Sequence, residues 1–180
     1  MTKLLSLGEL LIDMLPQDSH NTAYLPIPGG APANVAVGYA KLGGNAAFCG
    51  GMGDDYFAKQ LTDALKQYNV GTEYLFTIKN AQTAMVIVSL DETGERSFNF
   101  YRHNTADLLL APEHLQQIQW DEISTLHFCS NTLTSIAIAN TTLSALKQAK
   151  SHNKLVSFDV NLRYSLWHNI RDIEPNVRAC

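Results

Sequence analysis

The 180-residue sequence predicts an α/β protein whose parallel sheet is flanked by helices. Strands and helices alternate along most of the chain, which is typical of parallel sheets. The strands are continuous apolar runs, the pattern of a sheet that is covered on both faces. A loop around Gly29 and Gly30 leads into a helix of small side chains over residues 33–42, which suits close packing on a sheet. The β-rich stretch 83–102 interrupts the alternation and predicts a small β-hairpin.

The composition is that of a soluble globular protein. The formal net charge is −4, with 46% hydrophobic and 17% charged residues, so a general surface for nucleic acid or anionic membranes is not expected. Three cysteines, Cys49, Cys129 and Cys180, show neither zinc nor disulfide spacing, which suits a reducing compartment. The N-terminal segment reaches polar Ser6 too early for a signal peptide. We therefore expect a cytoplasmic protein without membrane or nucleic-acid partners.

In the first half of the chain, short apolar runs alternate with amphipathic stretches. The piece that follows Gly8 is extended, and side-chain alternation then places Glu9, Leu11 and Asp13 on one side. The expected elements are strands at 4–7 and 45–50, an extended segment at 10–15, a short strand at 24–25, and helices at 33–42 and 55–68.

The stretch 83–102 has the pattern of two strands joined by a turn at 91–94. On its return strand, alternation places Phe98, Phe100 and Arg102 on one face. An isolated hairpin is marginal in water, so large groups on both faces must cover something. Two interpretations follow: a lid over a substrate, shared with a second subunit, or an edge hairpin packed on its own domain.

After Pro112 the alternation of strand and helix returns. A parallel sheet therefore continues through this half of the chain. The expected elements are helices at 113–118 and 135–150, strands at 125–129 and 155–158, and a further helix beginning near Pro175.

Four short motifs occur in order along the chain. They are Gly-Glu-Leu-Leu-Ile-Asp at 8–13, Gly-Gly-Ala-Pro-Ala-Asn-Val-Ala-Val at 29–37, Gly-Asp-Asp-Tyr-Phe at 53–57 and Phe-Asp-Val-Asn-Leu-Arg at 158–163. This set resembles the PfkB (ribokinase-like) family of sugar kinases, most of all its fructokinase branch. The resemblance implies an incomplete ribokinase-like α/β domain over residues 1–180, with lid segments inserted at about 10–28 and 82–104 and the C-terminal nucleotide-binding part missing.

A sugar presents a ring of hydroxyls, so its site needs carboxylates and amides that accept and donate hydrogen bonds in pairs. A lone Asp13 is otherwise a turn or capping residue. The resemblance implies that the substrate is held by Asp13, Gly29, Gly30, Asn34 and Asp159, and that Phe98, Phe100 and Arg102 close the site from above. It also places Asn161 and Arg163 toward the phosphates, with Arg163 as support for the transition state.

Several of these residues have a purely structural alternative. A salt bridge between Asp159 and Arg163 would tie down a loop, and Glu9 would brace the glycine loop. Asp55 is expected to cap the following helix. His127, inside a strand, is expected to be a satisfied core residue rather than a metal ligand, and the sequence predicts no metal site.

Phosphoryl transfer to an alcohol needs positioning, charge neutralisation and a base that takes the hydroxyl proton. The resembled family carries its base and anion hole on a later Asp-Thr-x-Gly-Ala-Gly-Asp segment, which these 180 residues lack, and no Walker-type loop replaces it. We therefore expect no catalytic base in this chain, with ATP and Mg²⁺ bound mainly by the missing part. Either the chain is a truncated kinase, inactive and poorly stable alone, or it is a folded remnant that binds sugar or a partner.

The parent protein is then expected to phosphorylate a ketose such as fructose. A second candidate substrate is 2-keto-3-deoxygluconate, whose carboxylate Arg102 or Arg163 would neutralise. A third reading is a non-catalytic module for sugar binding or dimerisation, the latter a homodimer through the lid. A dinucleotide-binding oxidoreductase is disfavoured because residues 50–53 lack the Gly-x-Gly-x-x-Gly spacing.

Overall fold

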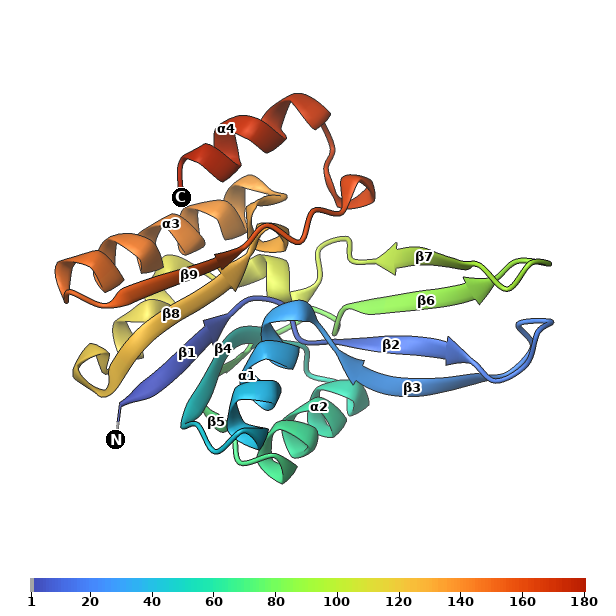
Figure 1. The fold of residues 1–180 in the computed structure, drawn as a ribbon, viewed down its shortest axis with the longest axis horizontal. Coiled ribbons are helices and arrows are strands. Elements are labelled where there is room, and N and C mark those ends of the chain that lie inside the picture. The colour runs from blue at the N-terminus through green and yellow to red at the C-terminus, as the bar shows by residue number, and fades with distance from the viewer. Residues whose placement is uncertain (1) are drawn as a thin grey trace.

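The computed structural model describes residues 2–180 as two β-sheets with flanking helices (Figure 1). The larger sheet has five parallel strands in the order β5-β4-β1-β8-β9. Its strands are β1 (Lys3–Leu7), β4 (Ala46–Met52), β5 (Gly71–Thr77), β8 (Ile123–Cys129) and β9 (Leu155–Asp159). The predicted parallel α/β sheet is therefore confirmed.

Helices cover both faces of this sheet, because each face carries apolar side chains. On one face lie α1 (Ala31–Lys41) and α2 (Tyr56–Gln67), packed against residues such as fully buried Phe48. The other face packs fully buried Phe128 against α3 (Ile136–Ser151) and the 3₁₀ helices between β7 and β8. Figure 1 shows α1 and α2 on the side of the sheet opposite α3. The short helix α4 (Ile173–Arg178) ends the chain.

Two element assignments from the sequence differ from the structure. Residues 113–118, expected as an α-helix, lie in a 3₁₀ helix at Pro112–Gln117. The strand β5 was not anticipated, because its residues mix polar and apolar types and only Tyr74 and Phe76 of the strand are buried. Among residues 2–180, β5 is an edge strand that pairs only with β4, so it needs no continuous apolar run.

The smaller sheet contains β2 (Leu11–Pro16), β3 (Tyr24–Gly29), β6 (Met85–Leu90) and β7 (Arg96–Tyr101), in the order β3-β2-β6-β7. The strands β6 and β7 form the expected antiparallel hairpin. The hairpin does not stand alone, because β6 pairs in parallel with β2, and β2 pairs with β3. This four-stranded sheet, here called the lid sheet, projects from the body of the molecule (Figure 1).

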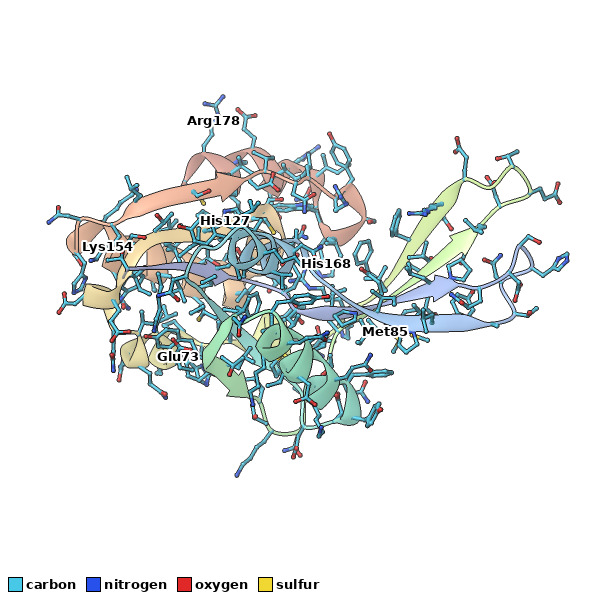
Figure 2. All side chains as sticks on the ribbon, turned by 60° about the horizontal axis from the view of Figure 1, so that its bottom comes forward. Glu73, Met85, His127, Lys154, His168 and Arg178 are labelled. Atoms are coloured by element: carbon cyan, nitrogen blue, oxygen red, sulfur yellow. The ribbon has the colours of Figure 1, made fainter. Side chains whose placement is uncertain are left out.

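Local contacts fix the junction between the lid sheet and the body. Met85, at the start of β6, lies where the two meet (Figure 2). Asp55 caps α2 as predicted, because its carboxylate accepts a hydrogen bond from the Ala58 N–H at 2.8 Å. The same carboxylate accepts from the N–H and hydroxyl of Thr83, each at 2.8 Å, and so ties α2 to the segment that enters β6.

His127 lies within the body of the molecule, on β8 (Figure 2). Its ring Nδ1 lies 2.9 Å from the Ser157 hydroxyl of the neighbouring strand β9, and the residue is only 6% exposed. Burial lowers the pKa of His127, which favours the neutral ring. It is a satisfied core residue, as expected.

Candidate functional site

A cavity of about 340 Å³ lies between the carboxyl ends of β1, β8 and β9, the start of α1, and one face of the lid sheet. Open α/β sheets bind ligands at this edge. The predicted site residues meet here from separate parts of the chain. Those that line the cavity are Asp13, Gly30, Asn34, Phe98, Phe100, Asp159, Asn161 and Arg163. Of the ten predicted binding residues, only Gly29 and Arg102 are absent from its lining.

A larger hollow of about 400 Å³ lies between β3, α1 and α2. Gly29 lines it, and Asn34 lines both hollows. The larger hollow is walled mainly by aliphatic and aromatic side chains and includes no carboxylate. The smaller cavity gathers Glu9, Asp13 and Asp159, the groups that can accept hydrogen bonds from hydroxyls. The smaller cavity is therefore the candidate site.

Glu9, which follows β1 and is only 2% exposed, forms hydrogen bonds that fix the glycine loop. Its carboxylate accepts hydrogen bonds from the Ala31 N–H at 3.3 Å and from the Asn131 amide at 2.9 Å. The thiol of Cys129 lies 3.7 Å from both carboxylate oxygens, and burial raises the pKa of this thiol, which keeps it a neutral donor. Glu9 thus braces the glycine loop at the start of α1, which is the structural role considered for it in the sequence.

Both glycines of the loop are required by close approaches. Gly30 has φ of +110°, and a Cβ on it would collide with the backbone carbonyl oxygen of Glu9. A Cβ on Gly29 would collide with the carboxylate of Asp13. The loop therefore lets Glu9 pass below it and lets the Asp13 carboxylate lie against it.

The lid sheet contributes a row of side chains to the upper wall. Asp13 on β2 is in register with Val86 on β6, and Val86 is in register with Phe100 on β7. Phe98 lies two residues before Phe100 on the same face and is 52% exposed. Partial burial raises the pKa of the Asp13 carboxyl above its ordinary value of 3.8.

The segment after β9 forms the far wall. The Asp159 carboxylate accepts a hydrogen bond from the Asn161 N–H at 3.1 Å, and Asn161 has φ of +30°. The guanidinium of Arg163 donates to the Leu162 carbonyl at 3.2 Å. Within residues 2–180 no ion pair joins Asp159 to Arg163, so the salt bridge considered for this loop is not formed.

Arg102 does not face the cavity, contrary to the expectation from strand alternation. The strand β7 ends at Tyr101, so the alternation stops one residue earlier. Arg102 is 8% exposed and forms a buried ion pair with Asp107. Two of its guanidinium nitrogens also donate to the backbone carbonyl of Asn131, each at 3.2 Å. Arg102 therefore anchors the end of the lid sheet to the body.

Asn131 is a cavity residue that the sequence reasoning missed. It lies in the 3₁₀ helix Ser130–Leu133, directly after β8. The rule that selected Asp159, a polar residue just past the carboxyl end of a parallel strand, applies equally to Asn131. That signal was present in the sequence.

The fold is that of an α/β protein in which a polar cavity lies between the body and the lid sheet. Residues 1–179 match the family described as pfkB family carbohydrate kinase, and the chain belongs to that family. Among its relatives, the fructokinase of Salmonella typhimurium is 40% identical over 166 residues, which are 91% of this chain and 52% of that protein. Fructokinase-2 of Zea mays is 40% identical over 167 residues, 90% of this chain and 50% of that protein.

Solved structures give the same result. A fructokinase from Xylella fastidiosa with bound ATP superposes with a TM-score of 0.91 at 40% identity, covering 99% of this chain and 56% of that one. A fructokinase from Vibrio cholerae, in a form with fructose, ADP and calcium ion bound, gives a TM-score of 0.87 at 34% identity, covering 99% and 56%. The chain thus spans about half the length of the relatives it matches.

Proposed function

We propose that this chain forms the sugar-binding part of an ATP-dependent, fructokinase-like sugar kinase. The proposed reaction transfers the γ-phosphoryl group of ATP to a hydroxyl of a ketose such as fructose. The observation that carries the proposal is the convergence of Asp13, Asn34 and Asp159 on one cavity beneath aromatic side chains. Family membership and the fructokinases among its relatives support the substrate class.

The proposed substrate contacts follow from the chemistry of the lining groups. Carboxylates of Asp13 and Asp159 accept hydrogen bonds from sugar hydroxyls, and the amide of Asn34 can both donate and accept. Phe98 and Phe100 would cover the bound sugar and exclude water, which otherwise competes as acceptor of the phosphoryl group.

The phosphate side of the proposal rests on Asn161 and Arg163. An arginine guanidinium pairs well with phosphate oxygens, and among residues 2–180 the guanidinium of cavity-lining Arg163 has a single hydrogen-bond partner, the Leu162 carbonyl. When bound, ATP supplies the phosphoryl group; these residues would orient it and neutralise its charge. Mg²⁺ is expected from the chemistry of phosphoryl transfer. Within residues 2–180 no group of three His, Cys, Asp or Glu side chains is arranged to hold a metal.

Two further features belong to the proposal, a homodimer and a cytoplasmic location. A homodimer through the lid sheet is supported by its unpaired edge strand β7 and by the exposed side chains of Leu25 and Tyr101. Sedimentation of the chain measures that state.

A cytoplasmic location is supported by the cysteines, since Cys49, Cys129 and Cys180 are all free thiols. No helix in the described residues is long and apolar enough to cross a membrane.

The test is a titration of the 180-residue chain with D-fructose in a calorimeter, followed by an ATP-dependent phosphorylation assay. We expect fructose to bind and the variant Asp13→Asn to bind it much more weakly. We expect no phosphoryl transfer, because no base is assigned among these residues. Failure to bind any ketose would overturn the proposal. Fructose phosphorylation by the chain would overturn the expectation of inactivity.

A sugar acid is the second candidate substrate, and Arg163 is the observation that favours it. The cavity-lining guanidinium would neutralise the carboxylate of 2-keto-3-deoxygluconate. Titration with both compounds distinguishes the two: tighter binding of the keto-acid, lost in Arg163→Gln, would support this alternative. Fructose binding without nucleotide binding in the protein purified from its source cells would instead support a non-catalytic sugar-binding module.

A further inference from the structure

We propose that Asn131 determines sugar specificity, with its side-chain carbonyl oxygen Oδ1 accepting a hydrogen bond from one hydroxyl of the substrate. This inference rests on the proposed function, because it assumes a sugar in the cavity of about 340 Å³ that Asn131 lines. The ligand class it selects is a neutral polyol.

The first observation is that Oδ1 of Asn131 has no hydrogen-bond donor among residues 2–180. Asn131 is 6% exposed, and its Oδ1 is buried without a hydrogen-bond partner among residues 2–180. Two other polar groups of the residue do have partners: the side-chain Nδ2 donates to Glu9, and the backbone carbonyl accepts from Arg102 and from the Thr134 hydroxyl at 3.0 Å. A buried acceptor without a donor is unfavourable and calls for an explanation.

The second observation is that the Asn131 side-chain amide cannot rotate by half a turn to give Oδ1 a hydrogen-bond donor. Its Nδ2 lies 2.9 Å from Oε1 of Glu9, so a flipped amide would place Oδ1 against a buried carboxylate. The Arg102 guanidinium holds the backbone carbonyl of the same residue at 3.2 Å. Asn131 is therefore fixed from both ends, with its acceptor oxygen held free before any ligand arrives.

These constraints define what the position recognises. Because Nδ2 is occupied, Asn131 offers a ligand only an acceptor, and a sugar hydroxyl is the donor that matches it. A ligand carboxylate at this corner would meet both Oδ1 and the carboxylate of Glu9, which disfavours a sugar acid. Asp13 would bind the ligand from the lid sheet, whereas Asn131 would accept a hydrogen bond from it at the end of β8.

The test combines one substitution with a set of altered sugars. Wild-type chain and the variant Asn131→Leu are titrated calorimetrically with D-fructose and with each monodeoxy fructose. We expect Asn131→Leu to bind fructose about tenfold more weakly, the size of one good hydrogen bond. For the one deoxy sugar that lacks the contacted hydroxyl, we expect wild type and variant to bind equally.

A purely structural role gives a different result. If Asn131→Leu weakened binding of fructose and of every deoxy sugar by the same factor, the inference would be wrong. Equal affinity of variant and wild type for fructose would also overturn it. A wild-type chain that binds no ketose would instead show that the proposed function fails, and the inference would fall with it.

Ser130 provides the matched control. Its hydroxyl is also buried without a partner among the described residues, but Ser130 does not line the cavity. We expect Ser130→Ala to leave fructose affinity unchanged. Should Asn131→Leu fail to fold, NMR of the ¹⁵N-labelled wild type replaces it: the Asn131 side-chain amide signals should shift with fructose and not with the matching deoxy sugar. Identical shifts with every sugar would overturn the inference.

Discussion

The two walls of the cavity are built in opposite ways. One wall, here called the floor, is formed by Glu9, Asn131 and the glycine loop at the start of α1. Its polar side chains are buried, with Glu9 2% and Asn131 6% exposed, and the Asn131 amide donates a hydrogen bond of 2.9 Å to the Glu9 carboxylate. In the lid sheet, most residues of β7 are exposed, and Phe98 keeps 52% of its surface. The floor is a preformed hydrogen-bond network in which, among residues 2–180, Oδ1 of Asn131 is left without a partner, whereas the upper wall presents uncovered aromatic surface.

This difference separates two contributions to recognition. The ordering cost of the floor is met when the protein folds, so a ligand finds its donors and acceptors already oriented. The exposed lid residues can lose water contact only when something covers them, so their contribution arises on binding. We therefore expect substitutions in the floor to affect folding, with the proposed sugar contact of Asn131 Oδ1 as a separate effect on binding, and substitutions on the open face of the lid to affect mainly binding.

The largest effect is expected at Arg102, where the two regions join. Arg102→Met removes the partner of buried Asp107, and an uncompensated buried charge costs about 3–5 kcal/mol. Denaturant unfolding of the chain measures this loss. The exposed pair of Lys59 and Asp63 is the control, and Lys59→Met should leave stability unchanged. Weaker fructose binding with unchanged stability in Arg102→Met would instead support a direct sugar contact for Arg102.

A pair of glycines sharpens the comparison. Gly30→Ala in the floor combines φ of +110° with a collision against the Glu9 carbonyl, and should cost about 2–5 kcal/mol of unfolding free energy. Gly94→Ala, in the turn between β6 and β7, has φ of +83° and no heavy atom within 4 Å, so only backbone strain of about 1–2 kcal/mol applies. Equal losses at the two positions would contradict the view that close packing distinguishes the floor.

Much of this fold follows from local sequence signals. Apolar runs that end at glycine or at a polar residue identified the central strands, and the strand-end rule placed Asp159 at the sheet edge where the cavity lies. Asp55 capped α2 because an aspartate before a helix has a local partner in the Ala58 N–H. These features depend on neighbours within a few residues, which is why the sequence reveals them.

Apart from Asn131, whose strand-end signal was present in the sequence, the features that were missed depend on tertiary contacts. The parallel pairing of β2 with β6 joins segments about seventy residues apart, and nothing local in either strand specifies it. Arg102 follows strand alternation in the sequence, yet its burial is decided by Asp107 and by the carbonyl of Asn131. The mixed polar and apolar residues of β5 did not predict a strand, which forms at the sheet edge by pairing with β4. Tertiary contacts decided each of these cases.

Fructose binding is expected to depend on pH through the carboxyl group of Asp13. Partial burial raises the pKa of its carboxyl above 3.8, so the acceptor is protonated and fructose binding weakens as pH falls through this raised pKa. Asp13→Asn should bind fructose about 10- to 100-fold more weakly at neutral pH, the loss of a charged hydrogen bond, and should lack this part of the pH dependence. Calorimetric titrations of both proteins across acidic pH measure it.

The same shift predicts an opposite effect on stability. A raised pKa means that the folded chain holds the Asp13 proton more tightly than the unfolded chain, so this residue costs stability as pH rises above 3.8. Asp13→Asn should therefore raise Tm slightly at neutral pH while it weakens binding. A lower Tm in the variant would indicate that the Asp13 carboxylate has a stabilising partner in the fold.

The smallest stability effect is expected at Phe98. Because half of its side chain is exposed, Phe98→Ala should change the unfolding free energy by no more than about 0.5 kcal/mol, whereas Phe48→Ala, at a fully buried position of β4, should cost about 3–5 kcal/mol. Fructose affinity should fall less than about fivefold. Parallel denaturation and titration of the two variants measure both quantities. A loss in Phe98→Ala as large as that in Phe48→Ala would mean that the open face of the lid is covered in solution, as a second copy of the chain docked there would cover it.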